Sequence, residues 1–106
     1  MEWALLTVRG EEDWRVKQSR SWEEGVERFF AALQQLDDFL ASEQPLRCSA
    51  ERLLQGPIAD ALTHVGQLAT LRRIAGSPIR GEDYSRAEIV VGRVGPDQAQ
   101  PVREFD

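Results

Sequence analysis

The sequence is poor in the residues that most catalytic and metal sites need. Its 106 residues include one histidine, His64, and one cysteine, Cys48. A lone cysteine cannot form a disulfide within the chain, which indicates a reducing, cytoplasmic location. We interpret Cys48 as a structural residue rather than a nucleophile, because no second cysteine or histidine supports that role.

The chain also lacks a long apolar run and an excess of basic residues. No stretch reaches the roughly 18 apolar residues that a membrane-spanning helix needs. The N-terminus has no basic segment of the kind that opens a secretory signal. Lys and Arg number 13 against 18 Asp and Glu, which gives a net charge of -5. This balance argues against a nucleic-acid partner and against adhesion to an anionic membrane.

Apolar residues at helical spacing dominate the rest of the sequence, which predicts one all-α domain over residues 1–106. We expect helices at about residues 2–17, 22–42 and 50–75, a short helix at 86–91 and an irregular tail to 106. Ser21 and Glu24 form a capping-box pattern before the second helix. Gly10 is a point at which the first helix breaks. Gly76 suits the left-handed end of the third.

The third expected helix carries the chain's most informative polar residues. Asp60 and His64 lie four residues apart, so both side chains point the same way from adjacent turns and can reach one cation. They flank an apolar face so wide that we expect the helix to be largely buried. The spacing alone leaves two interpretations open, a pair of metal ligands or a polar pair hydrogen-bonded at a helix interface. Gln67 lies one turn further on the same row, where it can support His64.

The segment "GPIADALTHVGQLATLRRIAGSPI" resembles the fourth-helix signature of the DinB-like (damage-inducible) metalloprotein superfamily. His64 matches the second ligand of that signature, Gly66 and Gln67 match its Gly-Gln, and Asp60 stands where the family commonly has a first histidine. The resemblance extends from about Trp22 to the tail. It implies a four-helix bundle with a divalent metal held by three histidines, one from the second helix and two from the fourth.

The chain departs from that pattern in two ways. Asp60 replaces a histidine, which moves metal preference from nickel or zinc toward harder ions such as manganese or iron. The chain is also shorter than the family's norm, and no other histidine stands for the ligand of the second helix. We expect the missing ligand to come from a second copy, from water, or from Glu51, Asp83 or Glu88.

Two long amphipathic helices cannot close a four-helix core alone. We therefore expect a homodimer that pools the helices of two copies, with these seams facing each other: Val26/Phe29/Leu33/Leu36/Leu40 and Ile58/Leu62/Val65/Ala69. The leading interpretation is a DinB-like helical-bundle protein that is non-catalytic or keeps a degenerate metal site. The alternatives are a metal-dependent enzyme of the thiol-transferase type and a fragment without independent function. The small-molecule ligand, if any, is not indicated by the sequence.

Overall fold

The computed structural model describes residues 1–11 and 21–105, and within these ranges the chain is mostly helical. Helix α1 spans Glu2–Arg9, α2 spans Trp22–Ala41, and α3 spans Ala50–Leu53. A π-helical turn, η1 (Leu54–Ile58), joins α3 to α4 (Ala59–Ile74). The tail contains strand β1 (Gly81–Glu82), a 3-10 turn η2 (Tyr84–Arg86) and strand β2 (Glu104–Phe105).

Capping residues set the helix ends that the sequence indicated. The Ser21 hydroxyl accepts a hydrogen bond from the backbone N–H of Glu24 at 3.2 Å, which confirms the predicted cap of α2. Gly10 ends α1 in the left-handed conformation, with φ 75°. Gly76 has φ 76° directly after the last turn of α4. The part of the expected first helix at residues 12–17 lies outside the described residues.

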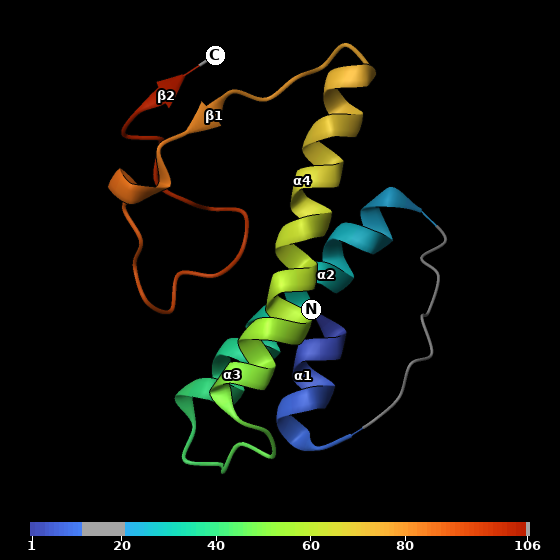
Figure 1. The fold of residues 1–106 in the computed structure, drawn as a ribbon, viewed down its shortest axis with the longest axis vertical. Coiled ribbons are helices and arrows are strands. Elements are labelled where there is room, and N and C mark those ends of the chain that lie inside the picture. Colours follow the sequence, from blue (N-terminus) through green and yellow to red (C-terminus); the bar gives the residue numbers. More distant parts are fainter. Residues whose placement is uncertain (12–20, 106) are drawn as a thin grey trace.

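Pro57 explains why the third helix is not uniformly α-helical. Proline has no backbone N–H and its ring crowds the preceding turn, so it disrupts the regular ladder of an α-helix. The chain accommodates Pro57 by widening into η1, and the helix then continues as α4. The expected helix at 50–75 is therefore one continuous rod in which α3, η1 and α4 follow each other without a loop (Figure 1).

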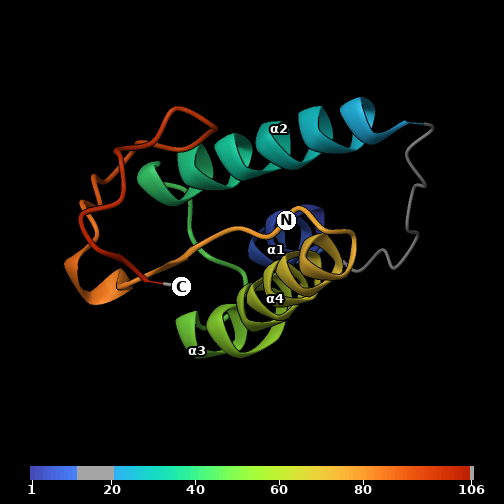
Figure 2. The same ribbon diagram turned by 90° about the horizontal axis from the view of Figure 1, so that it is seen from above.

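The core forms where α1 packs between the other helices. In Figure 2, α1 lies between α2 on one side and the α3–α4 rod on the other. α1 contacts α2, α3 and η1. Within the described residues, the backbones of α2 and α4 are not in contact with each other. The buried core is small and apolar, and it consists of Ala4, Leu5, Val8, Leu36, Phe39 and Leu53.

An ion pair adds to the packing of α1 against α2. The Arg28 guanidinium donates to both carboxylate oxygens of Glu2, at 2.9 and 3.0 Å from Nη2. Such a two-point contact fixes orientation as well as distance. It ties the first residue of α1 to the second turn of α2, beside the core.

Several expectations about packing were wrong for the single chain. Leu36, assigned to a seam between two copies, is buried against α1 in its own chain. Every residue of α4 is exposed or only partly buried, although its wide apolar face predicted a buried helix. Both differences have the same cause. α1 packs against α2 and so covers Leu36, whereas η1, and not α4, contacts α1.

The tail also differs from the expected short helix at residues 86–91. Asp83 is the N-cap of η2, and its side chain accepts hydrogen bonds from the backbone N–H and the hydroxyl of Ser85. The helical segment that follows this cap is only the three residues of η2. The following Ile89-Val90-Val91 run is β-branched and resists helix formation. β1 and β2 instead pair antiparallel, with Gly81 opposite Phe105. Figure 1 shows this strand pair set to one side of the upper part of α4.

Candidate functional site

Asp60, His64 and Gln67 form a connected row on the outer surface of α4. The Nδ1 atom of His64 lies 2.8 Å from the Gln67 side-chain oxygen. The Nε2 atom of the same ring lies 3.5 Å from an Asp60 carboxylate oxygen. The ring is therefore held between an amide one turn ahead and a carboxylate one turn behind. The Gln67 contact has hydrogen-bond length, and the Asp60 contact is a longer polar contact.

The same geometry fits two ligands of a divalent cation. Two ligand atoms bound at about 2.1 Å in a tetrahedron lie about 3.4 Å apart, close to the 3.5 Å between His64 Nε2 and the Asp60 oxygen. The Gln67 oxygen would then accept the proton on Nδ1, which fixes the ring tautomer that leaves Nε2 free to bind metal. The positions of Asp60, His64 and Gln67 thus suit both interpretations that the sequence left open.

The described residues of one chain do not supply a complete metal site. Within residues 1–11 and 21–105, no three His, Cys, Asp or Glu side chains are grouped to hold a metal ion. Glu51 lines a different cavity. Asp83 is engaged in the tail with Ser85 and with Arg86, the latter at 3.6 Å. A site that wants at least three protein ligands therefore does not fit the described residues of a single copy.

An apolar groove of about 620 Å³ runs beside the row. Its volume lies in the range of roughly 300–1,000 Å³ that ligand pockets occupy. One wall is the first half of α2, the other is the first half of α4, and the start of α1 closes the end between them. The lining side chains are mostly apolar, and they include Trp3, Trp22, Val26, Phe29, Phe30, Ala61, Val65 and Leu68.

Asp60 and His64 are charged or polar members of this lining. Their side chains are 52% and 63% exposed, so both remain accessible to solvent at the groove wall. The start of α1 lies beside the second turn of α2, where Glu2 pairs with Arg28, and the groove extends from there between α2 and α4. Any occupant would bury apolar surface and meet the Asp60–His64 pair along one edge.

The first turn of α2 is acidic, because it holds Glu23 and Glu24 just after the N-cap Ser21. A backbone N–H and then the Ser21 hydroxyl hold the pKa of the Glu23 carboxyl below its ordinary value. Within the groove itself, Asp60 is a carboxylate of the lining. A basic group on an occupant would therefore be favoured beside Asp60.

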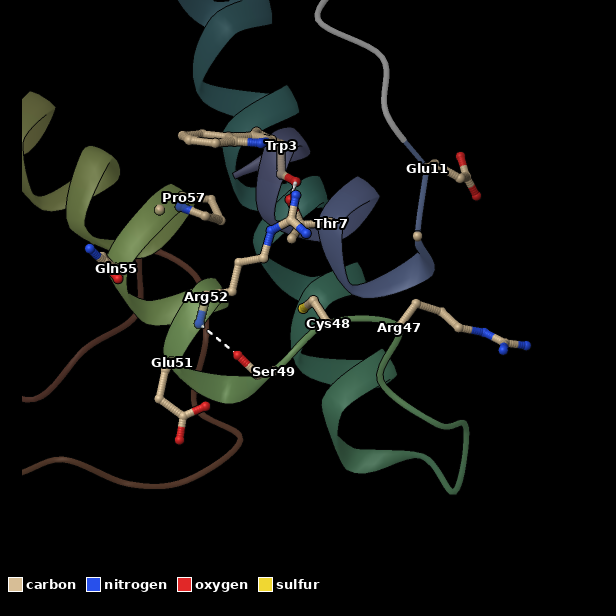
Figure 3. A pocket seen from close by; sticks show the side chains of 12 residues that line it. Trp3, Thr7, Glu11, Arg47, Cys48, Ser49, Glu51, Arg52, Gln55 and Pro57 are labelled. Atoms are coloured by element: carbon tan, nitrogen blue, oxygen red, sulfur yellow. Dashed lines mark hydrogen bonds between the residues drawn. The ribbon is translucent and has the colours of Figure 1, made fainter.

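A second cavity, of about 600 Å³, lies on the other side of α1 and contains Cys48 (Figure 3). Ser49 caps α3 by accepting a hydrogen bond from the Arg52 backbone at 3.1 Å, drawn as a dashed line in Figure 3. Cys48 is partly buried and packs against the core. Neither a histidine nor a second cysteine lines this cavity. This environment agrees with a structural role for the thiol.

Sequence reasoning identified the polar row but not the groove beside it. Periodicity assigns Trp22, Phe29 and Phe30 to an apolar stripe without saying which of them another helix covers. Trp3 and Trp22 carried a usable signal, since large aromatic side chains are enriched at interfaces.

Comparisons with family models, with curated proteins and with solved structures gave no match to this chain. The fold described above therefore defines only the class, a mostly helical protein. None of the described helices has the length and apolar character needed to cross a bilayer.

Proposed function

We propose that this chain is a DinB-like helical-bundle protein that acts as a non-catalytic assembly module and completes its bundle as a homodimer. The observation that carries the proposal is the apolar groove between α2 and α4, with the exposed apolar side chains of α4 along its wall. Leu62, Val65, Leu68 and Leu71 are all exposed on one helix. Contiguous apolar surface of this kind marks a site of protein association.

The resemblance to the DinB-like superfamily supports a bundle as the completed form. In that family two further helices would lie against the equivalents of α2 and α4. The groove between α2 and α4 could accept such helices, and among the described residues the short helix α1 closes one of its ends. A second copy supplies helices of matching character without any other partner.

The mass of the particle in solution tests this proposal. Size-exclusion chromatography with light scattering is expected to give twice the 12.0 kDa mass of the chain. The measurement should be repeated across protein concentrations, because dimer content follows mass action. A well-folded particle of 12.0 kDa at every concentration would refute it.

The Asp60–His64 pair favours a second, subordinate role in binding a divalent metal. The 3.5 Å spacing is right for two ligands, and the carboxylate favours manganese or iron over nickel. Protein purified without a metal-affinity column should contain divalent metal that is lost in His64→Ala. Equal metal content in the two proteins would exclude His64 as a ligand. Thr63→Ala, at a position rotated about 100° from His64, is the matched control.

The enzyme of the thiol-transferase type is the weaker candidate. Such an activity would need a metal with three protein ligands and an open position, and no group of three candidate ligands is found among the described residues of one chain. The fragment hypothesis is tested separately by urea unfolding, since a piece without its own stability shows no cooperative transition. A single cooperative transition that moves to higher urea with protein concentration would support the assembled module over both alternatives.

A further inference from the structure

One face of α4 extends from inside the groove to beyond it. Ala61 and His64 line the groove from the first half of the helix, and Leu68, just past its midpoint, lines the end of the groove. At about 100° per residue, Leu71 and Arg72 continue the same face past the end of the groove. The helix therefore has two halves with one common surface, of which the first forms a groove wall and the second projects from it.

We propose that the projecting half of α4 from a second copy fills the groove, with the two α4 helices antiparallel. The projecting half is defined here as Leu68–Ile74. This inference names the contact surface of the homodimer proposed above and rests on that dimer. Because the arrangement is two-fold symmetric, each copy both offers its projecting half and receives the other's. The register centres on Gly66, midway between Asp60 and Arg72.

The dimensions of the two parts match. Seven residues of α-helix, from Leu68 to Ile74, span about 10 Å at 1.5 Å per residue. The stretch of α2 that lines the groove, from Trp22 to Phe30, spans about 13.5 Å on the same basis, so the inserted half fits within it. In this register Leu71 of the second copy lies against Ala61, where a large side chain meets a small one. The aromatic side chains of α2 then cover the inserted helix from its other side.

Charge complementarity identifies the second copy as the occupant. The same register brings Arg72 of the second copy to the level of Asp60, whose carboxylate lines the groove. Arg72 is exposed and hydrogen-bonds the Ser77 hydroxyl at 3.1 Å, so it can turn toward a carboxylate at little cost. The symmetry makes this Asp60–Arg72 pair occur twice in each dimer.

Charge exchange between the two positions gives a test specific to this register. In Asp60→Arg alone, both pairs become Arg–Arg, and in Arg72→Asp alone, both become Asp–Asp. We expect each variant to lose at least about tenfold in dimer affinity, from two exposed pairs reversed. An equimolar mixture of the two variants restores both pairs, so it should form a mixed dimer of near-native affinity. Arg73→Asp is the matched control, because Arg73 is rotated about 100° from the face.

Disulfide trapping tests the register without depending on affinity. In a Cys48→Ser background, Val65→Cys places one thiol per copy a single residue from the proposed axis, within reach of its partner. Oxidation should link most of this variant into covalent dimers. Thr63→Cys, two residues away and on the far side of the helix, should stay unlinked. Circular dichroism of both variants confirms that the comparison is between folded proteins.

The outcomes separate this inference from the proposal on which it rests. Restored mixed dimers together with linked Val65→Cys support the α4 register. A wild-type dimer whose single charge variants keep full affinity, or in which Thr63→Cys links as readily as Val65→Cys, overturns the register and leaves the homodimer standing. A monomeric wild-type chain overturns both.

Discussion

Replacing Gly10 and Gly56 by alanine should change stability in opposite directions. Gly10 has φ 75°, a left-handed conformation, and a Cβ added there would lie 2.9 Å from Cβ of Arg47. A left-handed alanine costs about 1–2 kcal/mol. The close approach also requires Arg47 to move. The backbone N–H of Arg47 donates a hydrogen bond to the Val8 carbonyl, so this movement would disturb that bond. We expect Gly10→Ala to lower the free energy of unfolding by about 2 kcal/mol.

Gly56 lies within η1, and a Cβ added there would meet the Trp3 ring at 3.7 Å, an ordinary contact distance. Alanine is favoured over glycine in helical backbone by about 0.8–1.0 kcal/mol. We therefore expect Gly56→Ala to raise the free energy of unfolding by about 0.5–1 kcal/mol. Both variants add one methyl group, so they differ only in the position at which it is added.

Urea unfolding followed by circular dichroism, at one fixed protein concentration, measures both variants. The predicted difference of about 2.5–3 kcal/mol between them is large beside the total stability of roughly 5–15 kcal/mol for a domain. The slope of the transition should stay the same, since neither change alters the surface exposed on unfolding. Equal midpoints for the two variants, or a more stable Gly10→Ala, would refute the reasoning from φ and contact distance.

Three further predictions concern α2. Leu36 is 3% exposed and Leu40 is 47% exposed, so Leu36→Ala should cost about 2–5 kcal/mol of unfolding free energy and Leu40→Ala much less; equal losses in thermal or urea unfolding would contradict the assigned core. Ser21→Ala removes the N-cap and should cost about 1 kcal/mol, whereas Ser21→Asn, which can cap equally well, should cost little. The same Ser21→Ala change should raise the pKa of Glu23 toward its ordinary value, as followed by NMR titration of the side chain, because the hydroxyl is the second cause of the lowered pKa. A carboxyl with a lowered pKa stabilises the folded state at neutral pH, and this stabilisation is lost as the pH falls through that pKa. The Glu23 part of the pH dependence of the unfolding free energy should therefore be smaller in Ser21→Ala. An unchanged Glu23 titration would show that Ser21 does not lower the pKa.

Local signals predicted the helices well. The capping Ser21, the break at Gly10 and the left-handed Gly76 act through hydrogen bonds and backbone angles within a few residues, so they are readable in the sequence. The row of Asp60, His64 and Gln67 could be predicted from the sequence equally well. It depends on spacing along one helix, and the observed contacts of 3.5 Å and 2.8 Å follow that spacing.

The partners of each apolar face could not be predicted in the same way. Periodicity showed that Leu36 and Val65 both belong to apolar stripes. It did not show that α1 would cover Leu36 and leave Val65 exposed, because α1 is short and its packing partner is chosen by three-dimensional fit. The tail failed for a related reason. Ser85 and Glu88 match a capping box, but Asp83 competes for the Ser85 N–H and the pairing of Gly81 with Phe105 spans residues far apart in sequence.

The continuous rod of α3, η1 and α4 joins two regions of different local stability. Leu53 and Pro57 are buried near the core, so amide protons around them should exchange with solvent only when the whole domain opens. Amides from Leu68 to Ile74 belong to the projecting half and exchange through local fraying when the chain is alone. Hydrogen exchange along this single helix would therefore report folding at one end and association at the other.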